Sequence, residues 1–275
     1  MVKLLNNYSS WLVSETELSP KSTKIIKIAK LLDKKYRRKN NKFLIEGENA
    51  IEACAKSGNL LELFCTKNYL NKSTILEKIL EDSKIELNLI SQKSLEKITE
   101  TENPAGIVGI SNSIAKLLDN DDLLNKTFIL VLFDISDPGN VGTILRSADA
   151  FGVDLIVLVG NAVDVSNGKI VRSSAGSIFN VEIRISELGN LIHILKSFKG
   201  NIYQTKAHQK LNLTEVDLGK PLVWIFGNEA HGLQDFPHNL GVDVSIPMTG
   251  KTESLNVSTA ATLCMYETAK SRSIK

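Results

Sequence analysis

Two nearly continuous apolar runs, separated by one helical segment, are the strongest constraint on the fold of this chain. The runs are FILVLFD at residues 128–134 and VDLIVLVG at residues 153–160. Strands lose their polar alternation when helices cover both faces of a parallel sheet. Further strand-like runs follow at residues 179–185, 201–207, 221–226 and 242–248. The second half is therefore predicted to be an α/β domain with a mostly parallel sheet, closed by a helix from residue 257 to about residue 270.

Strand and helix signals also alternate in the first half, in shorter segments. Strands are expected at residues 43–47, 60–66, 85–91 and 106–111. The run ENAIEACAKSG between the first two is predicted to be a helix that Gly58 ends. A smaller α/β domain follows from this alternation. Residues 112–127 show no strand pattern and are interpreted as a linker, which gives four parts: an N-terminal extension (1–20), a first domain (21–111), the linker (112–127) and a second domain (128–275).

Length and cysteine usage describe an ordinary intracellular protein. The 275 residues suit two domains, and no apolar run approaches the ~18 residues of a membrane span. No secretion signal is recognised at the N-terminus. Cys54, Cys65 and Cys264 lie far apart on apolar segments, which favours reduced thiols in the cytoplasm over disulfides. The four histidines show no ligand spacing, so no metal site is expected.

The net charge of +2 conceals a strongly basic segment. Between Lys21 and Lys42 there are ten lysines and arginines, opposed only by Asp33. Apolar residues recur at helical spacing on one face of the segment's first part, and the stretch KKYRRKNNK is expected to follow as a basic loop. Two interpretations remain open: a solvated helix face, or a contact surface for a polyanion.

Three polar, glycine-containing loops follow predicted strands, where open parallel sheets bind their ligands. The first is DISDPGNVGTILRSADAFG at residues 134–152. On its helix Arg146 falls opposite the apolar face, where it could serve a ligand or simply pair with Asp149 on the surface. Asn140 could be a helix cap.

The second and third loops are WIFGNEAHGL at residues 224–233 and IPMTGKTESLNVSTAA at residues 246–261. Gly227 permits close approach of a ligand to the backbone, with Glu229 in the loop mouth; an ordinary glycine turn with a solvated glutamate is the alternative. Ser254 and Asn256 precede a predicted helix, and capping would explain either one. Capping does not explain Leu255, an apolar residue between them.

The three loops, in this order and spacing, resemble the three signature motifs of the SpoU (TrmH-type) RNA 2′-O-ribose methyltransferases. The segment KIIKIAKLLDKKYRRKNNKFLIEG resembles the N-terminal substrate-binding domain of many members, which is similar to ribosomal protein L30e. The resemblance covers all but the first 20 residues or so, with Ala230 standing where the family usually has glycine. It implies a C-terminal α/β-knot domain (SPOUT-type, a deep trefoil knot with a mostly parallel sheet) and a smaller L30e-like α/β domain.

The resemblance also implies an activity and its residues: methyl transfer from S-adenosylmethionine to a ribose 2′-hydroxyl of RNA. It places the cofactor at Thr205, Gly227, Ile246 and Leu255, with Leu255 covering the adenine. It assigns the catalytic positions to Arg146, Asn140, Glu229, Ser254 and Asn256. A guanidinium stays protonated and is a poor base, so we expect Arg146 to hold the target phosphate rather than to remove the hydroxyl proton.

The expected partners follow from the same resemblance. Ribosomal RNA, most readily of the 23S type, is favoured because the members that act on transfer RNA often lack the N-terminal domain. A transfer-RNA methyltransferase and a non-catalytic ribosome-assembly factor remain alternatives. Phosphate contacts are expected from the basic segment, at Lys34, Lys35, Arg37, Arg38 and Lys39. Family members are homodimers with composite active sites; Val257, Ala260, Ala261, Cys264 and Met265 suit either that interface or the core of one chain.

Overall fold

The computed structural model describes residues 12–83, 85–160 and 164–273. The chain forms two compact units. The first unit comprises Met1–Ile114 and Asp164–Asn180, and the second comprises Ala115–Val163 and Val181–Lys275. The polypeptide therefore passes between the units at three places, of which the predicted linker at residues 112–127 contains one.

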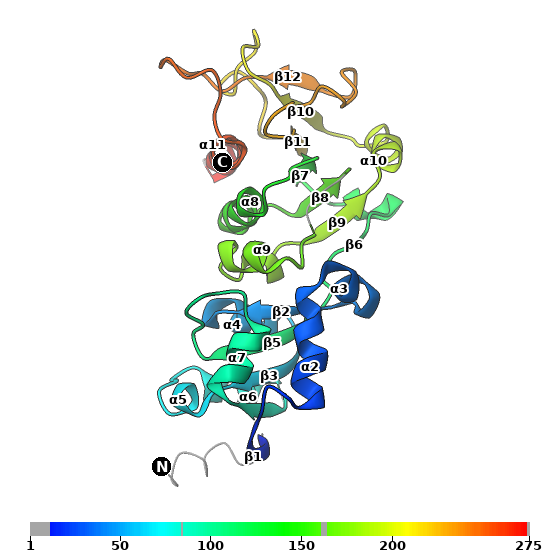
Figure 1. Ribbon diagram of the computed structural model, residues 1–275. Coiled ribbons are helices and arrows are strands. Elements are labelled where there is room, and N and C mark those ends of the chain that lie inside the picture. The colour runs from blue at the N-terminus through cyan, green and yellow to red at the C-terminus, as the bar shows by residue number, and fades with distance from the viewer. Residues whose placement is uncertain (1–11, 84, 161–163, 274–275) are drawn as a thin grey trace. The chain divides into compact units, whose positions relative to one another are not determined.

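The first unit contains a five-stranded mixed sheet (Figure 1). Its strands, in spatial order, are β1 (Leu12–Leu18), β4 (Leu87–Ile90), β3 (Leu60–Cys65), β5 (Ile107–Asn112) and β2 (Lys42–Glu46). β4 is parallel to both β1 and β3, whereas β5 is antiparallel to both β3 and β2. Strand β1 lies in the part that we interpreted as an N-terminal extension, and its backbone adds an edge to this sheet.

Helices surround this sheet. They are α2 (Thr23–Ala29), α3 (Lys34–Asn40), α4 (Glu48–Lys56), α5 (Lys67–Leu70), α6 (Leu76–Ser83), α7 (Gln92–Ile98) and α9 (Gly168–Ser173), with the 3-10 turns η1 (Lys30–Leu32) and η3 (Ser177–Phe179). The basic loop predicted over KKYRRKNNK is wrong, because its first seven residues, Lys34–Asn40, form α3. Asp33 caps this helix by accepting a hydrogen bond from the Tyr36 amide at 2.9 Å, and Asn41 ends it in the left-handed conformation.

The segment Asp164–Asn180 packs within the first unit although its neighbours in sequence belong to the second. Phe179 stacks on Phe43 of β2 with ring centroids 6.2 Å apart. Arg172 of α9 forms an ion pair with Glu46 at 3.3 Å. The predicted second domain is one continuous stretch, residues 128–275, whereas the second compact unit lacks Asp164–Asn180. The linker at residues 112–127 remains a prediction.

The second unit is built on a seven-stranded sheet, and the mostly parallel sheet predicted for it is confirmed. The strand order is β12 (Val242–Val244), β10 (Asn201–Thr205), β11 (Leu222–Phe226), β7 (Phe128–Phe133), β8 (Leu155–Val159), β9 (Ile183–Ser186) and β6 (Lys116–Leu117), with every pair parallel. Strand β6 lies in the segment expected to lack strand structure. Both of its side chains are exposed, so it has no apolar pattern that would reveal it.

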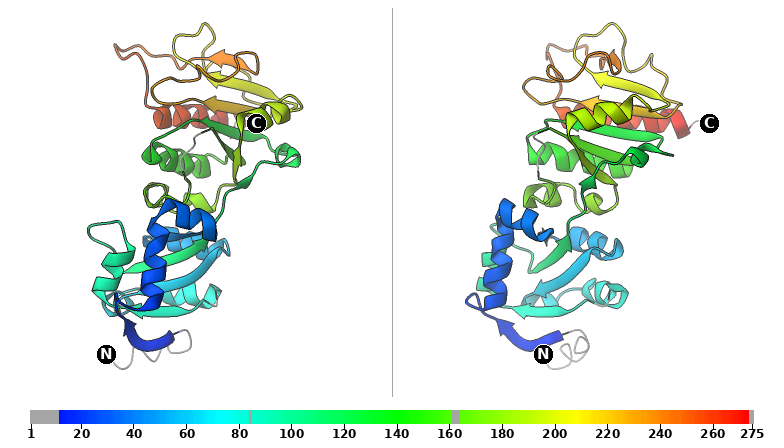
Figure 2. Two further views of the ribbon diagram at one scale, coloured as in Figure 1. Left: turned by 45° about the vertical axis from the view of Figure 1, so that its right-hand side comes forward. Right: turned by 90° about the vertical axis from the view of Figure 1, so that its right-hand side faces the viewer.

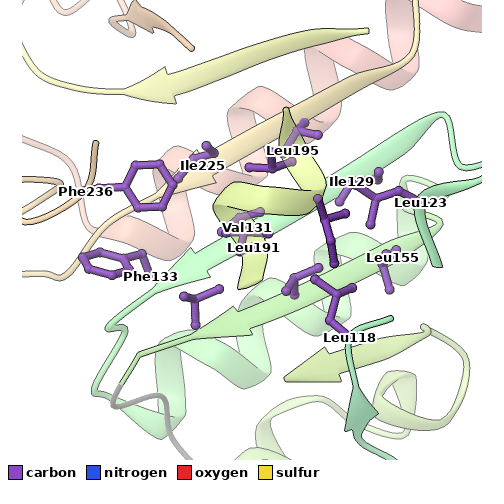
Figure 3. Packing of buried hydrophobic residues seen from close by; sticks show 14 of the residues in the cluster. Leu118, Leu123, Ile129, Val131, Phe133, Leu155, Leu191, Leu195, Ile225 and Phe236 are labelled. Atoms are coloured by element: carbon purple, nitrogen blue, oxygen red, sulfur yellow. The ribbon is translucent and has the colours of Figure 1, made fainter. Parts of the chain in front are cut away.

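Helices cover both faces of this sheet. Leu191 and Leu195 of α10 (Leu188–Leu195) pack on one face over Ile129 and Val131 of β7, as Figure 3 shows. The helices α8 (Pro138–Ala150) and α11 (Val257–Ser273) lie side by side on the other face (Figure 2). The 3-10 turn η2 (Asn120–Leu123) follows β6. In the described part of the chain, no helix is long and apolar enough to span a membrane.

Helix α11 is anchored to its own sheet. Trp224 of β11 is fully buried, and its indole N–H donates a hydrogen bond to Thr268 at 3.0 Å. Ala261, Cys264 and Met265 are at most 1% exposed within this single chain. These three residues therefore belong to the core of one chain and not to a subunit interface. An interface on α11 must use other residues.

Candidate functional site

A cavity of about 680 Å³ opens where β10 and β11 end. Its walls come from the loop after β11 and from the segment that precedes α11. All four positions expected for the cofactor line it: Thr205, Gly227, Ile246 and Leu255. The carboxyl ends of parallel strands and the loops that follow them thus meet around one space, as in other open α/β sheets.

The loop after β11 is a tight turn held by its own hydrogen bonds. The Gly232 amide donates to the Asn228 carbonyl at 2.8 Å. The side-chain oxygen of Asn228 accepts from the amides of Ala230 and His231 at 2.8 and 3.2 Å. The Asn228 amide group donates in turn to the Asp134 carbonyl at 2.8 Å, which attaches the turn to the end of β7. The turn is therefore a fixed wall of the cavity.

Glu229 connects this turn to the first polar loop. Its Oε1 accepts hydrogen bonds from Asn140 Nδ2 at 2.9 Å and from the Asp137 amide at 3.3 Å. Its Oε2 accepts from the amide and the hydroxyl of Ser136, both at 3.3 Å. With both oxygens occupied by donors, the carboxylate positions the loops.

The same contacts decide the protonation of Glu229. Burial acts to raise its pKa, but the hydrogen bonds from Asn140 and the nearby backbone amides outweigh burial, and the net pKa is lowered. Such a carboxylate is fully charged when the pH is above the ordinary carboxyl pKa. It loses its charge, and with it its role as a hydrogen-bond acceptor, only as the pH falls through the lowered pKa. Glu229 is therefore ionised at neutral pH.

Asn140 and Asn256 extend this network to the third loop. Asn256 Nδ2 donates to Asn140 Oδ1 at 3.0 Å, while Asn256 Oδ1 accepts from the Ser258 amide at 2.8 Å. Asn256 therefore caps α11 and contacts α8 at once. Asn140 is not the cap of α8, since Asp137 has that position. The chain Asn256–Asn140–Glu229 joins all three polar loops.

Ser254 and Arg146 stand apart from this network. Ser254 is exposed and lines the cavity. Arg146 is exposed on α8 and is not among the residues that line the cavity of its own chain. Within residues 12–83, 85–160 and 164–273, Arg146 has no hydrogen bond or ion pair, and the surface pair with Asp149 is not formed. Its guanidinium is thus available to a partner from outside the chain.

The structure divides the five basic residues expected to contact RNA. Arg37 is only 7% exposed, and its side chain forms an ion pair with Asp164 at 2.8 Å and donates to Ser166 Oγ at 3.1 Å. As an internal contact of the first unit, Arg37 cannot present its charge to a phosphate, and that assignment is wrong. Sequence reasoning treated the segment as a loop and so could not identify its inward face. The exposed members of the set are Lys34, Lys35, Arg38 and Lys39.

Sequence reasoning also missed charged groups in the cavity wall. Lys206 follows β10 and forms an ion pair with Asp243 at 2.8 Å, and its ammonium also lies 3.2 Å from His238 Nδ1. His231, at the turn after β11, lines the cavity as well. None of these belongs to a recognisable spacing, because they come together only through the pairing of β10 with its two neighbours, β11 and β12. Among the described residues, no group of three or more His, Cys, Asp or Glu is placed to hold a metal ion.

Comparison with known proteins identifies both parts of the chain. Residues 127–266 match the SpoU rRNA Methylase family, and residues 22–109 match the MRM3-like substrate binding domain. The chain is 30% identical over 249 residues to the 23S rRNA (guanosine(2553)-2′-O)-methyltransferase RlmP of Bacillus subtilis, covering 90% of this chain and 96% of that protein. It is 29% identical over 253 residues to the 23S rRNA (uridine(2479)-2′-O)-methyltransferase of Streptomyces viridochromogenes, covering 89% and 88%.

Solved structures give the same result. The SpoU methyltransferase AviRb from Streptomyces viridochromogenes, in complex with AdoMet, superimposes with a TM-score of 0.82 at 27% identity, covering 92% of this chain and 98% of that one. The AdoMet-bound rRNA methyltransferase from Sinorhizobium meliloti superimposes with a TM-score of 0.80 at 25% identity, covering 93% and 97%. Each similarity extends over both units.

Proposed function

Because this chain belongs to the SpoU rRNA Methylase family, we propose that it methylates a ribose 2′-hydroxyl of ribosomal RNA, most readily of the 23S type, with S-adenosylmethionine as methyl donor. One observation carries the proposal. Three loops far apart in sequence converge through the chain Asn256–Asn140–Glu229 at a cavity that contains every expected cofactor position. A protein that had kept only the fold would not need to retain this network and the exposed Arg146 together.

The cavity residues fit S-adenosylmethionine. Leu255, Ile246 and Val244 give the wall an apolar surface suited to a flat adenine ring, and Gly227 allows the backbone to approach the ligand. S-adenosylmethionine supplies a methyl group activated by its sulfonium. The work left to the chain is to align the ribose oxygen with that group and to accept the hydroxyl proton.

Gly227→Ala is expected to weaken S-adenosylmethionine binding at least ~10-fold and to destabilise the protein by about 1–3 kcal/mol. A Cβ at this position would lie 2.2 Å from the Gly232 carbonyl oxygen, so the turn that forms the cavity wall must shift. Gly250→Ala, in the third loop, is the matched control, because nothing lies within 4 Å of its added Cβ. Titration calorimetry and thermal melting measure both effects. Equal affinities for the two variants would contradict this part of the proposal.

Arg146 and the polar network have separate tasks in this proposal. Arg146 binds the phosphate next to the target ribose and thereby orients the 2′-oxygen, a geometry to which a guanidinium is suited by its paired N–H groups. The network of Asn140, Glu229 and Asn256 fixes the positions of the three loops relative to one another. Ser254, which is exposed at the cavity, contacts the bound ligands.

We propose that the exposed basic residues of α3 attract the RNA backbone. Arg38→Gln/Lys39→Gln should weaken RNA binding and lower the slope of log K against log salt by up to ~0.7–0.9 per lost phosphate contact. The affinity for S-adenosylmethionine should not change. Lys72→Gln/Lys78→Gln removes the same charge from exposed sites elsewhere in the first unit and is the control. If both double variants bind RNA with the same salt dependence, α3 is not the contact surface.

We further propose a homodimer that uses the exposed face of α11. Leu263 and Tyr266 are 38% and 48% exposed there, and Phe151 packs edge-on against Tyr266 at 6.0 Å. In such a dimer Arg146 would serve the cavity of the partner subunit, which would explain its position outside its own. Tyr266→Glu is expected to produce monomers in analytical ultracentrifugation. Leu117→Glu, at the exposed end of β6, should leave the dimer intact. If the Tyr266→Glu and Leu117→Glu proteins sediment with the same mass, the proposed interface is contradicted.

The activity itself is tested by methyl transfer in vitro. Purified protein, tritiated S-adenosylmethionine and either ribosomal or transfer RNA should yield label in ribosomal RNA, at a nucleotide whose 3′ phosphodiester resists alkaline hydrolysis. Label in transfer RNA alone would select that alternative, and cofactor binding without transfer would indicate a non-catalytic assembly factor. A cytoplasmic location agrees with the RNA substrate and with the three free cysteines.

A further inference from the structure

The proposed reaction requires a proton acceptor that the residues assigned so far do not provide. As the ribose oxygen takes the methyl group, its hydroxyl proton must pass to a base. A guanidinium is not deprotonated in proteins, so Arg146 is not that base. The following inference rests on the proposed function and concerns which side chain of the cavity performs this step.

Three of the four cavity-lining groups that could exchange a proton are already engaged. Glu229 accepts hydrogen bonds from Ser136, Asp137 and Asn140 of the first polar loop, which lower its pKa and its strength as a base. The Lys206 ammonium is held by Asp243 at 2.8 Å. His238 Nδ1 lies 3.2 Å from that same ammonium, so the lone pair of this ring nitrogen is engaged by Lys206.

His231 is the remaining group. Its ring has no hydrogen-bond partner within the part of the chain that the structure describes, and its side chain is exposed at the cavity. Its backbone is fixed: the amide donates to Asn228 Oδ1 at 3.2 Å, and the next residue, Gly232, closes the turn onto the Asn228 carbonyl. A rigid turn therefore carries a free imidazole two residues after Glu229, beside the expected cofactor positions.

We propose that the imidazole of His231 is the general base for the ribose 2′-hydroxyl. In the step, the ribose oxygen forms its bond to the methyl carbon while its O–H bond breaks, and the proton passes to the unprotonated ring nitrogen of His231. The methyl–sulfur bond breaks with its electron pair remaining on sulfur, so the sulfonium becomes a neutral thioether. The charge lost from sulfur appears on the imidazolium, and the proton then leaves to solvent through the exposed side of the ring.

His231→Gln tests this role in single-turnover methylation of ribosomal RNA between pH 5.5 and 9. The wild-type rate should rise with pH through one inflection and then level off, because a general base acts only in its unprotonated form. The variant should lose that inflection, and its rate on the plateau should fall by about 10²-fold. Its KM for RNA and its calorimetric affinity for S-adenosylmethionine should remain those of the wild type, because the ring is exposed and the turn is held by backbone bonds.

Two further measurements make the result decisive. His193→Gln removes an exposed histidine of α10 that does not line the cavity, and it should leave the rate and its pH profile unchanged. Added imidazole should partly restore the rate of His231→Ala. A His231→Gln protein with the wild-type profile, or with a higher KM for RNA and an unchanged rate, would overturn the role. A wild-type protein that binds S-adenosylmethionine but methylates no RNA would instead refute the proposed function.

Discussion

Arg146→Ala is expected to lower the rate of RNA methylation by about 10²–10³-fold, the usual loss when one preorganised donor is removed from a reacting oxygen or its phosphate. The affinity for S-adenosylmethionine should not change, because in the proposed mechanism Arg146 contacts the RNA phosphate and not the cofactor. Stability should also be unaffected, because the side chain is exposed on α8 and has no hydrogen bond or ion pair in the described residues.

Arg146→Lys separates the two roles considered for this residue. Lysine keeps the positive charge but not the paired N–H groups of the guanidinium, so a phosphate clamp should retain part of the activity. If Arg146 were the base, its replacement would instead change the pH dependence of the rate. We assign that pH dependence to His231. Single-turnover rates and calorimetry distinguish these results. Full activity of Arg146→Ala would remove Arg146 from the mechanism.

Arg37→Ala is expected to destabilise the protein by about 3–5 kcal/mol, although Arg37 belongs to a segment that looks like a nucleic-acid contact. The side chains of Arg37 and Asp164 are only 8% and 11% exposed, and removing one leaves the other charge buried without its partner. The carbonyls of Leu31 and Leu32 would also lose their guanidinium donors. Arg38→Ala, on the exposed side of the same helix, should change the melting temperature very little.

A paired replacement tests the explanation. Arg37→Met/Asp164→Leu removes both charges and should recover most of the stability lost in Arg37→Ala. The pH dependence gives a second check. Burial acts to raise the pKa of Asp164, but hydrogen bonds from Ser166 and Arg37 outweigh it, and the net pKa is lowered. The stabilisation is therefore present above the ordinary carboxyl pKa and is lost as pH falls through the lowered one. Identical melting of the Arg37→Ala and Arg38→Ala proteins would contradict this account.

The sequence predicted a strand correctly where burial of that strand required a run of apolar residues. The strands β7 and β8 lie under helices on both faces, so their apolar runs predicted a parallel sheet correctly. Strand β6 carries two exposed residues and left no such signal. The joining of Asp164–Asn180 to the first unit depends on long-range contacts such as the stacking of Phe179 on Phe43, which no local pattern encodes. The trefoil knot expected from the family remains a prediction.

The site was predictable as a set of residues but not as an arrangement. Gly227 and Leu255 could be selected because they are unusual in their loops, and both line the cavity. The hydrogen bonds that make Asn140 the centre of the network come from loops some ninety and more residues away in sequence. The environment of His231 was likewise not predictable, since the absence of a partner for its ring among the described residues is recognised only once the partners of Lys206 and Glu229 are known.

The central claim is that this chain methylates riboses of ribosomal RNA, and mapping 2′-O-methylated nucleotides in cells tests it most directly. Ribosomal RNA should be compared between cells with the gene, cells without it, and deleted cells that carry either the wild-type gene or Arg146→Ala. We expect at least one 2′-O-methyl site of 23S rRNA to disappear on deletion and to return only with the wild-type gene. A ribosomal methylation map that is the same with and without the gene would contradict the account.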